Sequence, residues 1–297
     1  MNIHKVAVIG AGTMGNGICH VFAQYGFQVS LVDISQNLLD KAIATIEKNL
    51  DRQVSKGVID QETKSKALGN ITCYIDIEAG VVQADLVVEA VIEELEVKRQ
   101  IFYKLDQICA TNALLASNTS SISITRLAAA TKRPDRVIGM HFMNPVPVMK
   151  LVEIIRGYAT TEIITHQISK LTEMLDKVPV VVNDYPGFIS NRILMPMINE
   201  AITALHEGVA GVREIDTIMK LGMGHPMGPL QLADFIGLDV CVSILRVLYE
   251  GLGNPKYAPC PLLINMVEAG HLGVKSGEGF YQWQQGTKEL VISKRFN

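Results

Sequence analysis

Short apolar runs alternate with longer amphipathic stretches through the first half of the chain. Most of the runs are continuously apolar, which is typical of strands buried on both faces of a parallel sheet. They are residues 6–9, 28–32, 71–74, 86–89, 114–116 and 137–141. Helical stretches between them, such as residues 15–25 and 36–56, would supply the crossovers. The pattern therefore predicts an α/β fold with a doubly wound sheet.

The pattern changes after the segment Asp184-Tyr185-Pro186-Gly187. Before it, residues 150–155 and 178–182 flank a helix-like stretch at 162–175 and could extend the same sheet. After it, helical periodicity continues with almost no strand pattern, over residues 189–207, 212–221, 228–248 and 262–269. A proline-glycine pair at a change of period marks a domain boundary. We expect a first α/β domain at residues 1–184 and an all-helical second domain at residues 185–297.

Composition and charge narrow the class of protein. The chain has 297 residues, a length that suggests about two domains. Hydrophobic residues make up 48% of it and charged residues 19%, which is enough apolar side chain for a sizeable core. The formal net charge of −3 predicts neither a nucleic-acid partner nor a polybasic membrane surface.

The cysteines and the apolar runs bear on the compartment. Five cysteines are scattered without a Cys-x-x-Cys spacing, and there is no His-Glu-x-x-His, so we expect no structural disulfides and no metal site. No apolar run approaches the ~18 residues of a membrane span. The N-terminus enters a strand within a few residues, which does not fit a signal peptide. These observations predict a cytoplasmic protein.

A glycine-rich turn directly follows the first predicted strand and opens a helix. It reads Gly10-Ala11-Gly12-Thr13-Met14-Gly15. A lone Gly-x-Gly-x-x-Gly is a weak signal, and a purely structural turn is the alternative. Here the next strand also ends on an acidic residue, Asp33, 18 residues after the last glycine. Together these contexts predict a Rossmann-type dinucleotide site, with the pyrophosphate at the N-terminus of the helix.

Asp33 also distinguishes between the two nicotinamide dinucleotides. A carboxylate accepts hydrogen bonds from the ribose hydroxyls of NAD and repels the 2′-phosphate of NADP. The residues that follow, Ile34-Ser35-Gln36-Asn37, include no arginine that would reverse this preference. We therefore predict NAD as the cofactor.

Polar residues gather where predicted strands end, the edge at which open α/β sheets bind ligands. Residues 117–121 read SNTSS after one strand, and His141 ends another. Glu153 lies twelve residues after His141, on a neighbouring predicted strand. Each has an ordinary alternative: a lone histidine is often structural, a serine-threonine cluster is often a helix cap, and a strand glutamate is often just exposed.

Taken together, these segments resemble the L-3-hydroxyacyl-CoA dehydrogenase family, and within it the bacterial 3-hydroxybutyryl-CoA dehydrogenases. The resemblance covers essentially the whole chain. Its motifs are GAGTMG at 10–15, ASNTSS at 116–121, GMHFMNPVPVMKLVE at 139–153, PGFISNR at 186–192, MKLG at 219–222, PMGP at 226–229 and KSGEGFY at 275–281. Two departures, Met143 and Gln231, touch no catalytic role.

The resemblance implies a role for each matching residue. His141 would be the general base that takes the proton of the 3-hydroxyl group, and Glu153 would orient and stabilise its ring. Ser120 would hydrogen-bond the substrate oxygen near the nicotinamide, and Asn191 would hold the reacting carbonyl from the second domain. A nucleophilic role for Ser120 is disfavoured, because the Gly-x-Ser-x-Gly elbow of serine hydrolases is missing.

The resemblance also implies contacts to the cofactor and to CoA. Besides the glycine turn, Asp33 and Ser120, the expected NAD contacts are Glu93, Lys98, Asn144 and Lys275. On the predicted helix at 36–56, spacings of three and four place Asn49, Arg52 and Lys56 on one face. The resemblance suggests that this face binds the CoA phosphates, and an ordinary solvated helix face remains the alternative.

For function, the leading hypothesis is reversible oxidation of a (3S)-3-hydroxyacyl-CoA to the 3-oxoacyl-CoA with NAD. 3-Hydroxybutyryl-CoA as the substrate rests on the resemblance alone, and the direction, in fatty-acid breakdown or in butyrate metabolism, stays open. A dehydrogenase of a free hydroxy acid, of the gulonate type, and a non-catalytic NAD-binding protein of the crystallin type are the alternatives. The second domain is strongly apolar at 193–198 and 238–242, so we expect it to close the substrate cleft and to form a homodimer.

Overall fold

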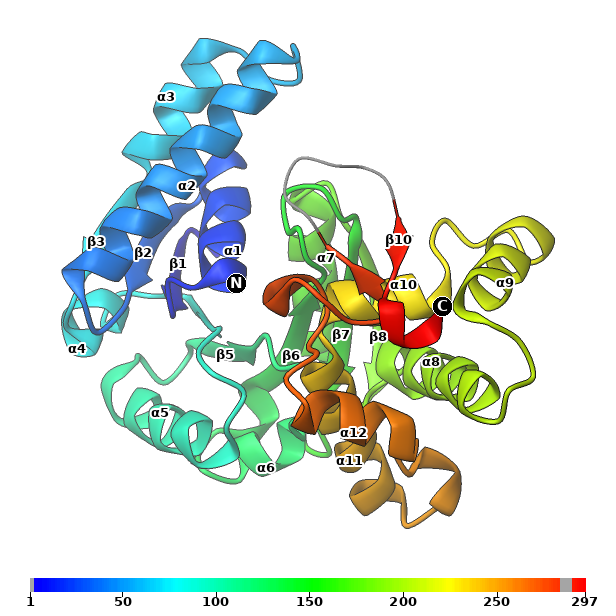
Figure 1. The fold of residues 1–297 in the computed structure, drawn as a ribbon. Coiled ribbons are helices and arrows are strands. Elements are labelled where there is room, and N and C mark those ends of the chain that lie inside the picture. The colour runs from blue at the N-terminus through cyan, green and yellow to red at the C-terminus, as the bar shows by residue number, and fades with distance from the viewer. Residues whose placement is uncertain (1–2, 284–289) are drawn as a thin grey trace. The chain divides into compact units, whose positions relative to one another are not determined.

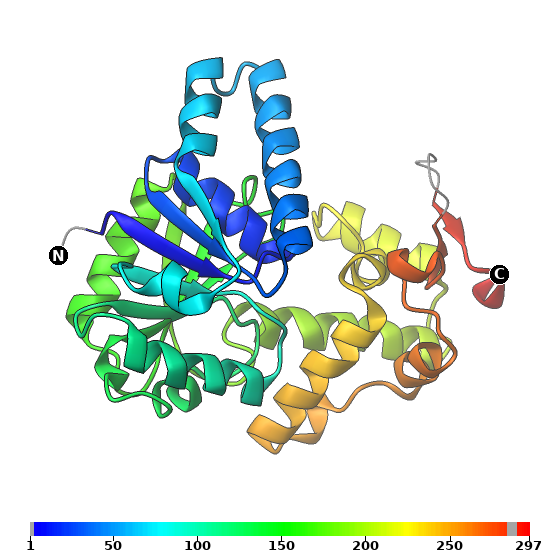
Figure 2. The same cartoon turned by 90° about the vertical axis from the view of Figure 1, so that its left-hand side faces the viewer.

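The computed structural model describes residues 3–283 and 290–297. The chain divides into two compact units, Met1–Tyr185 and Pro186–Asn297, and each is described by itself (Figures 1 and 2).

The first unit is built on one eight-stranded sheet, which confirms the predicted fold class. Its strands in spatial order are β3 (Ile71–Tyr74), β2 (Gln28–Val32), β1 (Lys5–Ile9), β4 (Leu86–Glu89), β5 (Leu114–Ser117), β6 (Val137–Phe142), β7 (Leu151–Arg156) and β8 (Val178–Asn183). The two runs that the sequence left open, at 150–155 and 178–182, are β7 and β8 of this sheet. Strand order reverses direction beside β1, which is the topological switch point where such folds bind ligands.

One strand runs against the others. β7 pairs with β6 in antiparallel register, whereas every other neighbouring pair in the sheet is parallel. The physical reason is the link between them, residues 143–150, which is shorter than the dozen or more residues that a parallel crossover needs. The reversal sets His141 directly opposite Glu153 in the ladder.

Helices connect the strands of the first unit. They are α1 (Thr13–Gln24), α2 (Gln36–Ser55), α3 (Gln61–Gly69), α4 (Ile77–Val81), α5 (Leu95–Ile108), α6 (Ile124–Ala128) and α7 (Glu162–Met174). α2 and α3 form an antiparallel pair that extends beyond the sheet (Figures 1 and 2).

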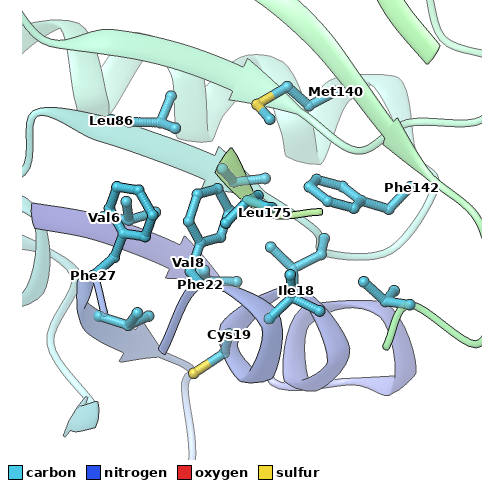
Figure 3. Packing of buried hydrophobic residues seen from close by; sticks show 14 of the residues in the cluster. Val6, Val8, Ile18, Cys19, Phe22, Phe27, Leu86, Met140, Phe142 and Leu175 are labelled. Atoms are coloured by element: carbon cyan, nitrogen blue, oxygen red, sulfur yellow. The ribbon is translucent and has the colours of Figure 1, made fainter. Parts of the chain in front are cut away.

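The core of the first unit lies between α1 and the sheet. Phe22 on α1 packs edge-on against Phe142 of β6, with ring centroids 6.4 Å apart, and Val8 of β1 belongs to the same buried cluster (Figure 3). Burial of these side chains, at about 25 cal/mol per Å² of apolar surface, is the main force that fixes the helix on the strands.

The second unit is mostly helical, as predicted. Its helices are α8 (Ser190–His206), α9 (Val212–Thr217), α10 (Pro229–Ile236), α11 (Leu238–Leu252) and α12 (Pro261–Glu268), and a π-helical turn at Ile218–Gly222 follows α9. The expectation of an all-helical domain needs one correction, because β9 (Tyr281–Gln282) and β10 (Val291–Ile292) form a small antiparallel sheet.

The single helix predicted at 228–248 is wrong. The structure has two helices there, and Gly237 between them adopts a φ of +101°, a conformation that side chains of L-residues rarely adopt. Apolar periodicity runs through the break on both sides, so the pattern alone does not reveal it.

The apolar stretches of the second unit mostly fill its own core. Met195, Ile198, Leu238, Cys241 and Val242 are buried in one cluster. Of the stretches 193–198 and 238–242, Ile193 and Val240 remain exposed, at 66% and 39%. Of the helices in the described ranges, 3–283 and 290–297, none combines the length and apolarity needed to span a membrane.

Candidate active site

The glycine-rich turn has the backbone geometry that its sequence predicts. Gly10 has a φ of +99°, and a Cβ there would come within 2.6 Å of the Ala90 carbonyl oxygen. A Cβ on Gly15 would come within 1.7 Å of the Gly10 carbonyl oxygen. A Cβ on Gly12 would meet no atom of the described residues within 4 Å, so the space in front of this residue is open. The turn thus leaves room for a pyrophosphate to approach the backbone at the N-terminus of α1.

Asp33 holds the turn as well as facing this site. One of its carboxylate oxygens accepts a hydrogen bond from the Ala11 amide at 2.6 Å, and the other accepts one from the Ile34 amide at 2.7 Å. The negative charge therefore stands beside the turn, where it suits ribose hydroxyls and opposes a 2′-phosphate. The turn and this carboxylate fit NAD.

His141 and Glu153 form a buried pair on β6 and β7. The Nδ1 atom of His141 lies 2.8 Å from a carboxylate oxygen of Glu153. Both side chains are buried, and residues opposite each other in an antiparallel ladder project from the same face of the sheet. A carboxylate on Nδ1 fixes the neutral ring in the tautomer that carries its proton there, which leaves Nε2 as a proton acceptor.

Asn118 fastens the end of β5 to the strand of His141, a link that the sequence did not indicate. Its side-chain oxygen accepts a hydrogen bond from the Phe142 backbone amide at 2.9 Å, and its backbone N–H donates to the Glu89 carbonyl at 2.8 Å. The side chain of Asn118 thus fixes the end of β5 relative to the end of β6.

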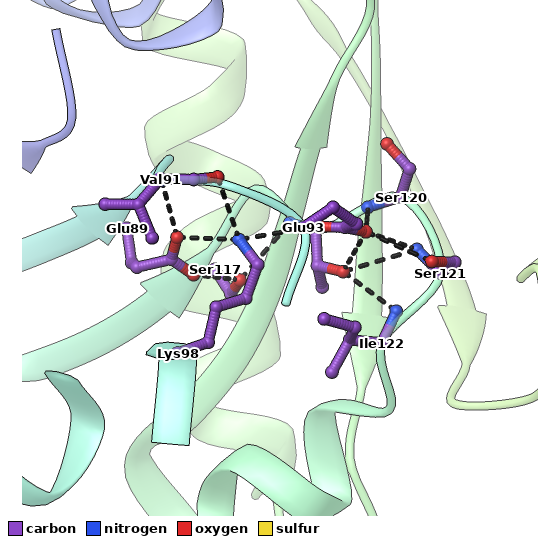
Figure 4. Close-up of polar contacts among 9 residues, drawn as sticks. Glu89, Val91, Glu93, Lys98, Ser117, Ser120, Ser121 and Ile122 are labelled. Atoms are coloured by element: carbon purple, nitrogen blue, oxygen red, sulfur yellow. Dashed lines mark hydrogen bonds and ion pairs between the residues drawn. The ribbon is translucent and has the colours of Figure 1, made fainter. Parts of the chain in front are cut away.

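Glu93 clamps the loop that carries Ser120 (Figure 4). A single carboxylate oxygen of Glu93 accepts hydrogen bonds from the Thr119 hydroxyl at 2.6 Å, the Ser120 amide at 2.7 Å and the Ser121 amide at 3.0 Å. Its side chain remains 39% exposed. Glu93 can therefore hold this loop and still meet a ligand.

The ammonium group of Lys98 lies between Glu89 and Glu93, and only 1% of the Lys98 side chain is exposed (Figure 4). Its ammonium group contacts a carboxylate oxygen of Glu89 at 2.7 Å and one of Glu93 at 3.4 Å. The sequence indicated Lys98 and Glu93 but not Glu89, because a glutamate at the end of an apolar run looks like an ordinary exposed strand end.

The three residues expected to bind CoA line one cavity. Asn49, Arg52 and Lys56 face a hollow of about 400 Å³ in the first unit, together with Lys150 and Lys177. Burial lowers the pKa of the Lys177 ammonium to about 8, and this group donates to the carbonyl oxygens of two residues in the β6–β7 link. The sequence did not indicate Lys150 or Lys177, because they are far from the helix in the chain.

The remaining predicted residues are placed as follows. Asn144 lies exposed in the β6–β7 link, directly after β6. Asn191 is buried in the first turn of α8, and Lys275 forms an ion pair with Asp239 at 2.5 Å, both within the second unit. Within residues 3–283 and 290–297, no group of three or more His, Cys, Asp and Glu side chains is arranged to hold a metal ion.

Comparison with known proteins gives matches over both units. Residues 5–185 match the family model described as 3-hydroxyacyl-CoA dehydrogenase, NAD binding domain, and residues 187–283 match the corresponding C-terminal domain. A 3-hydroxybutyryl-CoA dehydrogenase of Bradyrhizobium diazoefficiens is 56% identical over 95% of this chain and 96% of its own length. A 3-hydroxyadipyl-CoA dehydrogenase of Escherichia coli is 43% identical over 98% of this chain and 61% of its own length.

A solved structure agrees with these matches. The crystal structure of (S)-3-hydroxybutyryl-CoA dehydrogenase from Ralstonia eutropha superposes with a TM-score of 0.93 at 47% identity, covering 96% of this chain and all of the other.

Proposed function

We propose a substrate and a mechanism for this chain, which belongs to the 3-hydroxyacyl-CoA dehydrogenase family and is an NAD-dependent enzyme. The substrate is a (3S)-3-hydroxyacyl-CoA, with 3-hydroxybutyryl-CoA favoured by the name of the Bradyrhizobium relative. The product is the 3-oxoacyl-CoA, and the reaction is reversible. The observation that carries this proposal is the buried His141–Glu153 pair at the ligand-binding edge of the sheet.

The pair provides the proton chemistry. When bound, NAD supplies the acceptor for the hydride that leaves C3 of the substrate. Nε2 of His141 removes the proton of the 3-hydroxyl group, and the carboxylate of Glu153 stabilises the imidazolium that results. In the reverse direction the imidazolium returns the proton to the developing alkoxide. The 2.8 Å contact between the two side chains supports this assignment.

The other site residues bind and orient. Ser120 donates to the substrate oxygen, and its place on the loop held by Glu93 supports that role. Asn191 holds the reacting carbonyl from the second unit. The glycine turn, Asp33, Ser120, Glu93, Asn144 and Lys275 contact NAD. Lys98, which was expected among these contacts, is 1% exposed and acts through Glu93 instead. The buried position of the Lys98 ammonium supports this division.

CoA binds at the cavity lined by Asn49, Arg52 and Lys56. Two cations, Arg52 in the last turn of α2 and Lys56 directly after it, suit the phosphates of the nucleotide. The added presence of Lys150 and Lys177 in the same wall supports this assignment, although Lys150 also pairs with Asp176.

The enzyme works as a homodimer through its second unit and resides in the cytoplasm. Ile218, Leu221 and Met223 are exposed around the π-helical turn, and Leu221 is 83% exposed, which supports a partner surface there. All five cysteines are free thiols, which supports a reducing compartment.

One experiment tests the proposal against its alternatives. NADH absorbance is followed with acetoacetyl-CoA, a 3-oxoadipyl thioester of CoA and free acetoacetate. We expect the highest kcat/KM with acetoacetyl-CoA. Turnover with the free acid alone would indicate a dehydrogenase of the gulonate type, and NADH binding without turnover would indicate a binding protein. A preference for the oxoadipyl thioester would move the substrate to a longer, carboxylated acyl chain, as the name of the Escherichia coli relative suggests.

A further inference from the structure

Glu89 is a buried acid at the end of β4 that the mechanism above does not use. Its side chain is inaccessible to solvent. One carboxylate oxygen accepts hydrogen bonds from the Val91 amide and the Lys98 ammonium, both at 2.7 Å. The other accepts one from the Ser117 hydroxyl at 2.6 Å (Figure 4). Two of these donors, the Val91 amide and the Ser117 hydroxyl, lie in or beside loops that border the proposed cofactor site.

These bonds join two loops through one carboxylate. Ser117 also accepts a hydrogen bond from the Thr119 amide at 3.2 Å. Ser117 therefore links the loop with Ser120 to Glu89. Glu93 holds the same loop from the other side, and Lys98 connects Glu93 to Glu89. The position of the Glu93 carboxylate thus depends on where Glu89 holds the ammonium group.

Glu89, Glu93 and Lys98 form a cluster with more carboxylates than ammonium groups. Two carboxylates share one ammonium, and the formal sum is −1. The ammonium lies nearer Glu89, at 2.7 Å, than Glu93, at 3.4 Å. The ammonium group is thus more closely engaged by Glu89 than by Glu93, and it compensates the exposed carboxylate of Glu93 less.

We propose that Glu89 is a positioning residue that shifts the relative affinity of the site toward the oxidised cofactor and away from the reduced one. By holding Lys98 closer to itself, it limits how far this ammonium compensates the carboxylate of Glu93. The nicotinamide ring carries a positive charge in NAD⁺ and none in NADH, so a negative charge nearby favours NAD⁺. This inference rests on the proposed contact between Glu93 and the cofactor.

The test compares dissociation constants for the two cofactor forms in the absence of substrate. NADH binding is measured by its fluorescence and NAD⁺ binding by calorimetry. In Glu89→Gln, Lys98 is left to pair with Glu93, and the cluster becomes neutral. We expect the Kd ratio of NAD⁺ to NADH to rise by roughly tenfold. Glu89→Asp keeps the charge and should keep the ratio near that of the parent enzyme.

A double variant separates charge from simple disruption. Glu89→Gln with Lys98→Met removes both members of the neutral pair and leaves Glu93 with its charge. The Kd ratio should return to within about twofold of the parent value, because the sum is again −1. If Glu89→Gln does not fold, this double variant and Glu93→Gln still test the inference, since only Glu93→Gln should raise the ratio.

A matched control is present on α5, the helix that carries Lys98. Asp106 near the end of α5 forms a buried ion pair with Arg133 at 2.8 Å, away from the loop of Ser120. Asp106→Asn should lower the melting temperature of the cofactor-free enzyme and leave the Kd ratio unchanged. An equal weakening of NAD⁺ and NADH binding in Glu89→Gln, like that of a general loss of stability, would overturn the inference.

Failure of the premise gives a different result. If Glu93→Gln leaves the Kd ratio unchanged, Glu93 does not meet the nicotinamide part of the cofactor, and both its proposed contact and this inference are wrong. If Glu93→Gln raises the ratio and Glu89→Gln does not, only the role of Glu89 is wrong. The substrate proposal is unaffected in either case, because turnover of acetoacetyl-CoA by the parent enzyme tests it separately.

Discussion

At the scale of single residues, acidic side chains of the first unit act largely on backbone amides. Asp33 binds the amide of Ala11, and Glu93 binds those of Ser120 and Ser121. Hydrogen bonds to a charged acceptor are short and strong, so each carboxylate fixes the shape of a loop as well as its charge. The loops that we propose as cofactor contacts are thereby shaped by carboxylates that also place negative charge beside them.

His141→Gln should separate catalysis from binding. The amide side chain cannot accept the hydroxyl proton at neutral pH, so we expect kcat to fall by about 10²- to 10⁴-fold. Glutamine is close in size to histidine, and NADH affinity should stay within a few-fold of the parent value. Steady-state rates with acetoacetyl-CoA and fluorescence titration with NADH measure the two effects. A kcat close to that of the parent would exclude His141 as the base.

How far single residues could be predicted depends on how far their partners lie in the chain. His141 and Glu153 are twelve residues apart on strands that the sequence indicates, so their pairing could be predicted from the sequence. Glu89 meets Lys98 and Ser117, and Ser117 lies 28 residues away. No periodic pattern connects those positions, and only the order of strands in the sheet brings them together.

At the scale of elements, the last turns of α2 and the residue after it carry the candidate CoA contacts Asn49, Arg52 and Lys56. Arg52→Ala combined with Lys56→Ala should raise KM for acetoacetyl-CoA by about tenfold, since two charged contacts to phosphate are lost. KM for a truncated acetoacetyl thioester without the nucleotide should change little. Initial rates with both substrates give the comparison. An equal rise for both thioesters would remove CoA from this face.

In the second unit, Asp234 on α10 ties the helix to the segment around β9. Its carboxylate accepts hydrogen bonds from the amides of Phe280 and Tyr281 and from the Trp283 ring. These donors are neutral, and a carboxylate without an opposite charge beside it among the described residues is costly to bury in its charged form. Burial raises the pKa of Asp234 to about 6.

This acid should make the stability of the second unit depend on pH. The folded pKa is about 6 and the unfolded value about 4, so folding takes up a proton between these values. The contribution of Asp234 to the free energy of unfolding is therefore full below about pH 4 and falls as pH rises through 6, by on the order of 3 kcal/mol.

The measurement uses Asp234→Asn, which cannot titrate. Urea unfolding is followed from pH 4 to 7 by the fluorescence of Trp283, the single tryptophan of the chain. The parent should lose stability relative to the variant as pH rises. A difference between the two that stays constant over this range would contradict the assigned pKa.

Elements were predicted best where burial and period agree. The eight strands of the sheet are short apolar runs in the sequence, and the hydrophobic pattern indicated each of them as a strand or as a possible extension of the sheet. The break at Gly237 was missed because the apolar positions of α10 and α11 continue one helical pattern across it. Antiparallel β7 follows from the short link before it, which is a constraint of chain length and not of side-chain pattern.

At the scale of the whole molecule, the exposed apolar residues around the π-helical turn predict self-association. We expect the mass of a dimer in light scattering at micromolar concentration. Leu221→Glu should shift the population toward monomer, because it places a charge in an apolar contact. Ile34→Glu, at another highly exposed apolar position, in the first unit, is the control and should leave the mass unchanged. A monomeric parent would refute the dimer.

The reversed strand β7 has a consequence for how the acid–base pair is supplied. His141 and Glu153 come from adjacent strands of one sheet, joined by a short link, so both are fixed as soon as that sheet forms. Their 2.8 Å hydrogen bond is therefore made within the sheet itself, between two strands of the first unit. Dipoles and charges that are oriented in advance lower a barrier without a reorganisation cost at the moment of reaction. If His141 is the proton acceptor that we propose, the antiparallel step makes it a preorganised part of the scaffold.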